Sequence, residues 1–288
     1  MSGTDGPTTT ACYRHPDRPA LTVCTRCERP ICGDDLIEAP VGYQCPECAK
    51  GGQPVRRLRD LRPSAQLTRV LVGLLVVGFA ATAGRPGSPI GQTLSLVPAL
   101  VGLGEWWRIV TSGFVHAGVI HIAFNGYLLW LLGNQLEPAL GRGRFATIYA
   151  GGLVGGSLGV CLLAWLTVAT GLAGIPVLGD VFATSPVSQT VGASGAVFGL
   201  MGAAMVGLRR QGVNPWRSDI GGLVLLNLLL TFFLSGISVG GHLGGFAAGA
   251  LVTGIVLRDR KRASLVTGIV AVVAMAVLTI ALSVALFD

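Results

Sequence analysis

The sequence predicts an all-α polytopic membrane protein that carries a small cysteine-rich domain near its N-terminus. Of its 288 residues, 51% are hydrophobic and 12% are charged, a composition too apolar for an ordinary soluble domain. Apolar stretches long enough for membrane helices recur from residue 67 to residue 286. Six of the seven cysteines lie between Cys12 and Cys48, in a polar stretch. The chain therefore divides into a polar cysteine-rich part and an apolar part.

Seven apolar stretches make up the second part. At a rise of roughly 1.5 Å per residue, a helix from each can cross about 30 Å of hydrocarbon, so a lipid bilayer is the expected surrounding. The segment 85–118 carries Trp106 and Trp107, which suit the membrane interface, and is expected to lie there without spanning. The stretches are 67–84, 119–136, 145–169, 191–208, 220–236, 239–257 and 264–286.

Composition divides the whole chain into four regions. Residues 1–11 are rich in Ser, Thr and Gly and are expected to be disordered, and residues 51–66 form a basic linker. Between them lies a small domain, residues 12–50, and after them the membrane domain, residues 67–286. The polar regions hold no apolar run of the length that a signal peptide needs, so none is expected.

Arginine clusters predict the orientation of the chain. They precede the first apolar stretch and follow the second, fourth and sixth, whereas the other connections carry little positive charge. Because cytoplasmic loops are enriched in Lys and Arg, we expect a multi-pass plasma-membrane protein with a cytoplasmic N-terminus and an outer C-terminus. The clusters do not form one basic face, so the net charge of +7 does not predict nucleic-acid binding.

Four polar residues in the apolar stretches are candidates for chemistry, because polar side chains are costly in hydrocarbon. His121 and Asn125 are four residues apart and share one helix face. Ser194 and His242 lie near the outer starts of the fourth and sixth stretches. All four are predicted at similar depth on the outer side, where Ser194 can act as a nucleophile and His242 as its general base.

Glycines flank both of these residues. Gly195 and Gly199 lie one turn apart, and Gly241, Gly245 and Gly249 recur at every fourth residue. Such faces let two helix backbones approach closely, as a nucleophile and its base require. The alternative, that serine and histidine merely serve helix packing, would suit either motif alone but not their combination with an outer His/Asn pair.

The acidic residues argue against other classes of membrane protein. None of the fourteen falls in the middle of an apolar stretch, where aspartyl intramembrane proteases and proton-coupled transporters place carboxylates. No HExxH occurs, so a zinc metalloprotease is not indicated. Glu137, at the inner end of the second stretch, is expected to form an ion pair with Arg142 or Arg144.

Four motifs occur within residues 67–286: Trp107-Arg108, His116, His121 and Asn125 as H-x4-H-x3-N, Gly192-Ala193-Ser194-Gly195, and Gly241-His242 followed by glycines. In these motifs the segment resembles the rhomboid family of intramembrane serine proteases. The resemblance implies a six-helix core with an outward-opening active site, plus a seventh C-terminal transmembrane helix. It also implies cleavage of transmembrane segments of membrane proteins by a Ser-His dyad, without a catalytic cofactor and with a small residue before the scissile bond.

The same resemblance implies roles for individual residues. His121, Asn125 and the backbone N–H of Ser194 would bind the oxyanion. Phe198 would pack beneath the catalytic histidine, where the family often has tyrosine. A rival interpretation is a catalytically silent rhomboid-like binder of transmembrane helices, which should lack the serine or the histidine. The supporting residues are Gly192, Gly195, Phe198 and His116.

The cysteine-rich domain contains four pairs of metal-ligating residues, each with two residues between its members. A turn can present both members of such a pair to one ion, and eight ligands suit two tetrahedral Zn²⁺ sites. The pattern resembles a B-box-type zinc finger, in which alternate pairs share a metal. That implies one ion on Cys12, His15, Cys32 and Asp35, and a second on Cys24, Cys27, Cys45 and Cys48.

Alternatives to this metal-binding scheme are pairing in sequential order and, at one position, Asp34 in place of Asp35. A disulfide framework is disfavoured because cytoplasmic thiols stay reduced. So short a stretch buries little apolar surface, and metal is therefore expected to supply most of its stability. Its expected role is regulation or the binding of a cytoplasmic protein partner.

Overall fold

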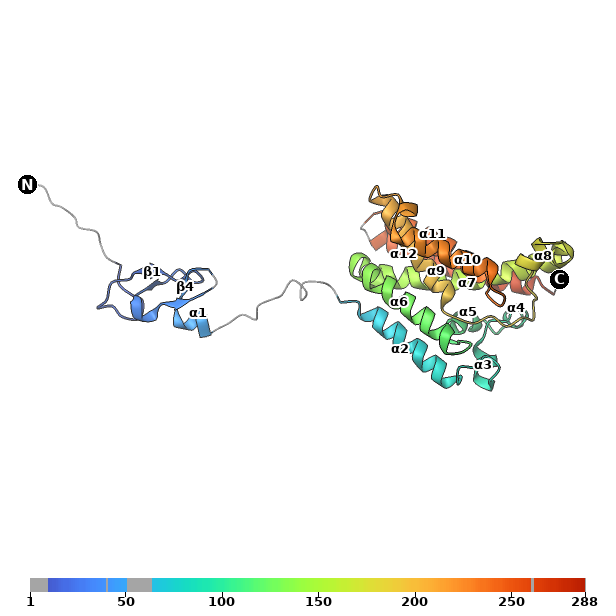
Figure 1. Ribbon diagram of the computed structural model, residues 1–288, viewed down its shortest axis with the longest axis horizontal. Helices are drawn as coiled ribbons and strands as arrows, with labels where there is room; N and C mark the ends of the chain where they lie inside the picture. The colour runs from blue at the N-terminus through green and yellow to red at the C-terminus, as the bar shows by residue number, and fades with distance from the viewer. Residues whose placement is uncertain (1–9, 40, 51–63, 260–261, 288) are drawn as a thin grey trace, which may run out of the picture. The chain divides into compact units, whose positions relative to one another are not determined.

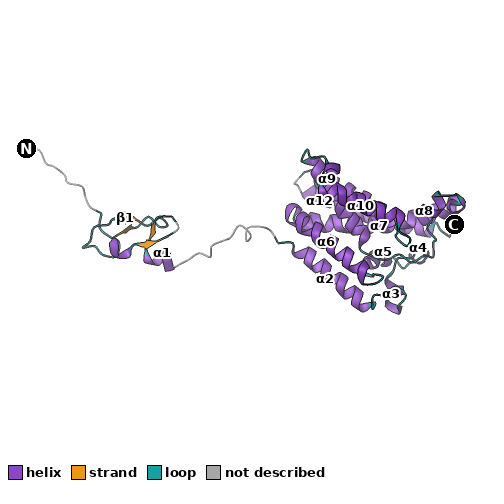
Figure 2. Ribbon diagram, in the orientation of Figure 1, coloured by secondary structure: helices purple, strands orange, loops and turns teal. Residues whose placement is uncertain are grey.

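The computed structural model describes residues 10–39, 41–50, 64–259 and 262–287. It contains two compact units, Met1–Arg62 and Pro63–Asp288. The first unit is built from short strands and short helices, and the second is almost entirely helical (Figures 1 and 2). Most of the predicted disordered N-terminus and most of the predicted basic linker lie outside the described residues.

The first unit consists of two small antiparallel hairpins and two short helices. Strand β1 (Thr22–Val23) pairs with β2 (Pro30–Ile31), and β3 (Ile37–Glu38) pairs with β4 (Tyr43–Gln44). The 3-10 helix η1 (Gly33–Asp35) follows the first hairpin, and α1 (Pro46–Lys50) follows the second. Its buried apolar core comprises Cys24, Ile31 and Cys45, too little to stabilise a fold of this length by burial alone.

The second unit contains a long helix for each of the seven apolar stretches. Short helices fill the connections, including the segment predicted to lie in the interface. The seven long helices are α2 (Gln66–Ala81), α6 (Val119–Leu140), α7 (Arg142–Thr170), α9 (Ser194–Arg210), α10 (Asp219–Phe233), α11 (Val239–Val256) and α12 (Arg262–Val284). The short ones are α3 (Pro89–Leu94), α4 (Pro98–Gly102), α5 (Arg108–Thr111), η3 (Ser112–Phe114), η4 (Leu172–Gly174), α8 (Leu178–Phe182) and η5 (Pro215–Arg217).

Several of these helices have the length and composition of membrane spans. Among the described residues, α7, α11 and α12 qualify singly, and α6 makes a fourth if it is counted with the segment Arg108–Phe114, from which it bends by 100°. Helices α2 and α10 are apolar but shorter. The chain is therefore a multi-pass membrane protein, and a core of six spans plus a seventh stays a prediction.

Glycine contacts hold α7 against both α9 and α11 at the centre of this unit. A Cβ atom at Gly199 of α9 would lie 2.5 Å from the Cα of Gly152 on α7, and one at Gly159 would lie 2.1 Å from the carbonyl oxygen of Gly240 on α11. Side chains at these positions would force the backbones apart. The glycines of α9 and α11 were predicted from the sequence, whereas the packing of α7 against both of these helices was not.

Glu137 has a different main partner from the one expected. Its buried carboxylate accepts hydrogen bonds from the backbone N–H groups of Leu67 and Thr68, at 2.9 and 2.7 Å, and from the Thr68 hydroxyl at 2.7 Å. These are otherwise unpaired N–H groups at the start of α2, where negative charge is favoured. Arg142 Nε lies 3.9 Å away, so the expected ion pair is present as a secondary contact.

Candidate active site

Ser194 is the first residue of α9, and the glycine before it fixes the approach of the chain. Gly192 has φ = +118°, which favours glycine. Its N–H donates to the carbonyl of Ser112 at 3.0 Å. A Cβ atom at Gly192 would lie 2.6 Å from His121 Nε2, so the His121 ring occupies the space of a side chain. The helix therefore begins at the serine, three residues after the start of the apolar stretch.

The segment before Ser194 is held by the connection between α2 and α6. Leu96 and Thr190 exchange two backbone hydrogen bonds, at 3.0 and 2.8 Å. Arg108 is buried and donates to the carbonyls of Gln92 and Ser95, at 2.5 and 2.7 Å. The predicted interfacial segment is thus an ordered support for the serine, and Arg108 organises it.

The start of α9 is rich in unpaired donors. By helix geometry, the N–H groups of Ser194 and the next two residues have no intrahelical acceptor, and they form the positive end of the helix dipole. The preceding N–H, of Ala193, donates to Nε2 of the buried His116 at 3.4 Å. His116 therefore holds the backbone that leads into the serine. An anion that develops beside Ser194 would meet donors there.

His121 and Asn125 present side-chain donors to the same place. The N–H of Ala117 donates to His121 Nδ1 at 3.3 Å, so the neutral ring carries its proton on Nε2, which points to Gly192. Asn125 Nδ2 donates one hydrogen to the carbonyl of His121 at 3.1 Å, which leaves its second hydrogen available. The predicted shared face of these two residues is present, and it is turned toward the loop before Ser194.

His242 lies in the first turn of α11 and packs on α9. Ser238 caps this helix by accepting from the N–H of Gly241 at 3.0 Å. The His242 ring stacks on Phe198, one turn after Ser194, with centroids 4.1 Å apart and planes inclined by 19°. The structure records no hydrogen bond between Ser194 and His242 among the described residues, and such contacts tighten when substrate binds.

Close backbone contact brings these two helices together, as their glycines predicted. A Cβ atom at Gly245 would lie 2.2 Å from the carbonyl oxygen of Gly195, and one at Gly249 would lie 2.2 Å from that of Gly199. These two contacts lie in successive turns of both helices, after Ser194 on α9 and after His242 on α11.

Gly245→Ala should therefore destabilise the protein, by about 1–3 kcal/mol as for other overpacked sites, because it would force α9 and α11 apart. Thermal unfolding in detergent measures this effect. Gly254→Ala on the same helix is the matched control, since an added Cβ there meets no atom within 4 Å and alanine favours helix. Equal effects of the two substitutions would contradict this account.

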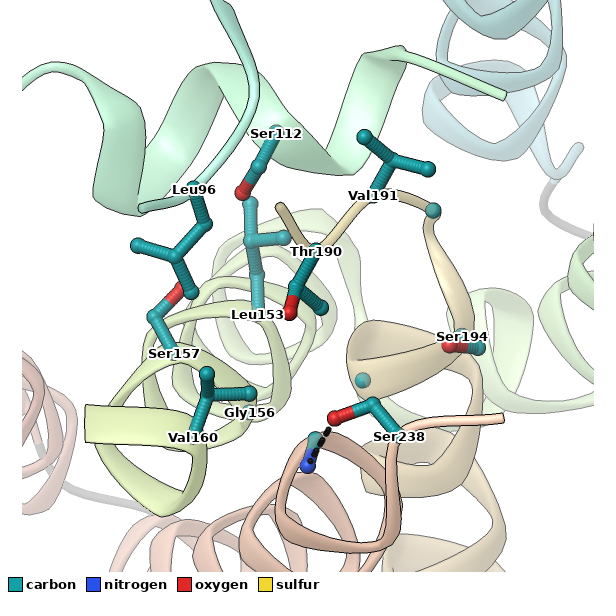
Figure 3. A pocket seen from close by; sticks show the side chains of 13 residues that line it. Leu96, Ser112, Leu153, Gly156, Ser157, Val160, Thr190, Val191, Ser194 and Ser238 are labelled. Atoms are coloured by element: carbon teal, nitrogen blue, oxygen red, sulfur yellow. Dashed lines mark hydrogen bonds between the residues drawn. The ribbon is translucent and has the colours of Figure 1, made fainter. Parts of the chain in front are cut away.

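A small cavity of about 30 Å³ adjoins Ser194 (Figure 3). Hydroxyl groups and glycine surfaces make up much of its wall, and Ser112, Ser157 and Thr190 contribute from three different segments. A cavity of this size and polarity accepts water or a small side chain next to the serine.

The membrane part of the chain is similar in sequence to known proteins. The model of the Rhomboid domain matches residues 103–259, more than half of the chain. The chain belongs to the rhomboid family. It is 32% identical over 196 residues to "Rhomboid protease GluP" of Bacillus subtilis (strain 168), a match that covers 64% of this chain and 34% of that protein.

Other rhomboid relatives come from distant organisms. "Rhomboid protease AarA" of Providencia stuartii is 27% identical over 205 residues, covering 65% of this chain and 70% of that protein. "RHOMBOID-like protein 5" of Arabidopsis thaliana is 32% identical over 158 residues, covering 52% and 44%. The chain thus spans about a third of the length of GluP and under half of the length of RHOMBOID-like protein 5. The predicted membership of the rhomboid family is confirmed.

One residue in contact with His242 was not predicted from the sequence. Thr231 of α10 places its Oγ1 2.7 Å from His242 Nδ1. The available signal was a hydroxyl residue inside an otherwise apolar stretch, with Asn227 one turn before it. Within one helix such a residue commonly bonds its own backbone, so the sequence alone did not distinguish it.

The first unit contains two compact groups of metal-ligating side chains, and in each group the ligand atoms lie within 4.8 Å of one another. Each group combines alternate ligand pairs along the chain, the first with the third and the second with the fourth. All of the cysteines are free thiols. The first group is Cys12, His15, Cys32 and Asp35, and the second is Cys24, Cys27, Cys45 and Cys48.

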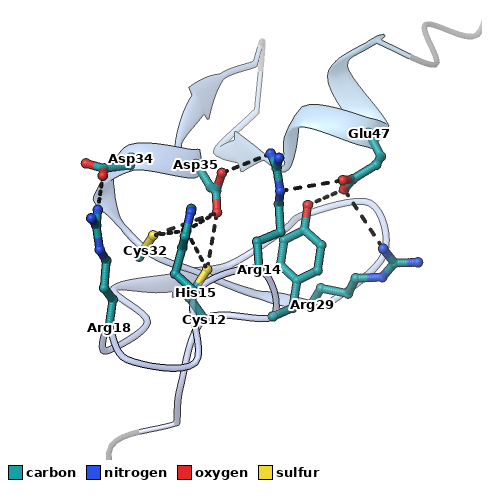
Figure 4. A network of polar contacts seen from close by, with 10 residues as sticks. Cys12, Arg14, His15, Arg18, Arg29, Cys32, Asp34, Asp35 and Glu47 are labelled. Atoms are coloured by element: carbon teal, nitrogen blue, oxygen red, sulfur yellow. Dashed lines mark hydrogen bonds and ion pairs between the residues drawn. The ribbon is translucent and has the colours of Figure 1, made fainter.

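The side chains of the first group lie together (Figure 4). The distances between their ligand atoms are close to those of a tetrahedral site. His15 Nδ1 lies 3.4 Å from Cys32 Sγ and 3.1 Å from Asp35 Oδ2. Ligands at about 2.0–2.3 Å from a zinc ion at tetrahedral angles are about 3.3–3.8 Å apart. Asp35 is buried in this group, whereas Asp34 is exposed and pairs with Arg18.

In the second group, the pKa of one thiol is lowered and the pKa of another is raised. Burial opposes ionisation of Cys24, but backbone N–H groups, including that of Cys45 at 3.3 Å, outweigh it and lower its pKa to about 6. Hydrogen bonding to Cys45, together with burial, raises the pKa of Cys48 to about 12. Neighbouring thiolates repel one another, and a bound cation would remove that repulsion.

Proposed function

We propose that this rhomboid protein is an intramembrane serine endopeptidase that cleaves transmembrane segments of membrane proteins with a Ser194–His242 dyad. The observation that carries the proposal is the position of Ser194 at the donor-rich start of α9, with His242 stacked on Phe198 one helical turn away. The names of the bacterial relatives as rhomboid proteases support the same activity.

The proposed reaction is acyl transfer. His242 takes the hydroxyl proton of Ser194, whose Oγ attacks the peptide carbonyl, and then gives a proton to the leaving amine. The oxyanion is bound by the N–H of Ser194 and by the side chains of His121 and Asn125. His242 then activates a water molecule that hydrolyses the ester. No carboxylate in the described part of the chain pairs with His242, so we infer a dyad and not a triad.

The cavity beside Ser194 supports a preference among substrates. Its walls combine glycines and small hydroxyl residues with the apolar side chains of Leu96, Leu153, Val160 and Val191. The cavity is small, so we infer a small residue before the scissile bond. The active site opens to the outer face of the plasma membrane, where water can reach the acyl-enzyme. This orientation is inferred from the arginine clusters in alternate connections.

A serine-directed fluorophosphonate tests the activity directly. The purified protein in detergent should be labelled once, and Ser194→Ala should abolish the label. Reconstitution with a panel of transmembrane helices then identifies cleavage products by mass spectrometry. A folded protein that binds helices but takes no label and cleaves none would be a catalytically silent rhomboid-like binder instead.

We also propose that the first unit is a cytoplasmic zinc-binding module of the B-box type, residues 12–50, with two structural Zn²⁺ ions. Each ion is held by one of the two groups of four ligands, and the ligand spacing fits a tetrahedral ion. The module is expected to bind a cytoplasmic protein partner or to regulate the enzyme, and it takes no part in the chemistry.

A further inference from the structure

The contact between Thr231 and His242 joins α10 to the catalytic helix α11. Both side chains are buried, and Oγ1 of Thr231 lies 2.7 Å from Nδ1 of His242. The same oxygen donates to the backbone carbonyl of Asn227, also at 2.7 Å. Thr231 thus takes part in two short hydrogen bonds through one hydroxyl group.

These two bonds determine which nitrogen of His242 carries the proton. A hydroxyl has one hydrogen, and a carbonyl oxygen can only accept, so the hydrogen of Thr231 is used in the bond to Asn227. Oγ1 must then accept from His242, which requires a hydrogen on Nδ1. In the neutral ring, Nε2 is left with a lone pair. A histidine that takes a proton from a serine needs this tautomer.

Of the described groups around His242, Thr231 is the one that can fix the position of the ring proton. Phe198 covers one face of the ring with an aromatic group that makes no hydrogen bond to it. Among the residues that the structure describes, the Thr231 hydroxyl is the hydrogen-bond partner of the ring, and no carboxylate forms an ion pair with it.

We propose that Thr231 is a positioning residue that keeps His242 protonated at Nδ1 and stabilises the imidazolium formed during catalysis. The role rests on the proposed protease function. The proton of Ser194 moves to Nε2, while the Nδ1 proton stays on the ring and is bound by Thr231 Oγ1. Thr231 thereby takes the place that a carboxylate has in a catalytic triad.

Thr231→Val keeps the shape of the side chain but removes the hydroxyl. It should lower kcat by about 10- to 100-fold, the loss expected for one hydrogen bond to a charged group, with little change in KM. Thr231→Ser should restore most of the activity. Thr253→Val is the matched control, because Thr253 is also buried and bonds the carbonyl of Gly249, one turn earlier, at 2.7 Å. It should leave kcat unchanged.

The tautomer itself is read by NMR of protein labelled with ¹⁵N-histidine. The chain has four histidines, and the His242→Ala spectrum assigns the signal of His242. We expect a proton on Nδ1 in the wild type and in Thr231→Ser, and a shift toward Nε2 in Thr231→Val. If Thr231→Val does not fold, the position of the His242 proton in the wild type and in Thr231→Ser still tests the proposal.

Three results would overturn the proposal: wild-type His242 protonated at Nε2, full activity in Thr231→Val, or equal losses in the valine and serine variants. Failure of the proposed function is a separate outcome. In that case the wild type would cleave no substrate, or Ser194→Ala would leave cleavage intact, while the ¹⁵N spectrum would still report whether Thr231 sets the tautomer.

Discussion

Replacing either Ser194 or His242 by alanine should abolish cleavage of a transmembrane substrate, with a loss on the order of 10⁴-fold or more in kcat. The serine supplies the attacking oxygen and the histidine removes its proton, so neither step proceeds without the other. The double variant should therefore be no worse than either single variant. Single-turnover cleavage of one reconstituted substrate by all three variants measures this.

Folding must be monitored alongside these rates, since both residues lie among packed helices. Ser283→Ala is a suitable control, because Ser283 is a buried serine of α12 that lies outside the groups proposed for catalysis. It should retain both the wild-type melting temperature and the wild-type rate. Residual activity above about a tenth of wild type in either dyad variant would show that another group performs its step.

Removal of zinc should unfold the first unit and leave catalysis nearly intact. Metal binding supplies on the order of 10 kcal/mol to the folding of zinc-finger modules, whereas a serine dyad needs no metal. Elemental analysis of the purified protein should give about two zinc ions per chain. After treatment with a strong chelator, limited proteolysis should cut within residues 12–48 while the cleavage rate persists.

Cysteine variants separate the metal sites from the membrane part. Cys24→Ala removes one ligand of the second group and should lower the zinc content from about two ions to about one. Cys161→Ala is the control, since Cys161 is buried in α7 outside both groups and should leave zinc unchanged. Two results would contradict this division: a shortened chain that begins near residue 63 and is folded but inactive, or a loss of turnover when zinc is removed from the full chain. Either result would show that the first unit is an obligate part of the enzyme.

The helical architecture was predictable because hydrophobicity is a local property of the chain. Each apolar stretch became a helix, and the close approach of α9 and α11 followed from glycines that recur at every fourth residue. Helix ends were less predictable. The fourth stretch starts at residue 191, yet α9 begins at Ser194, because the conformation of Gly192 and its bond to Ser112 belong to the loop.

The sequence by itself determined the class of protein, its family, and the residue types available for catalysis and for metal binding, since these depend on composition, motifs and spacing. Tertiary structure alone decided which groups meet. Glu137 caps a helix that begins 71 positions before it in the chain, and Thr231 reaches His242 from a different helix. Sequence separation carries no information on such distances, because packing of whole helices sets them and each buried polar group then takes the partner within reach.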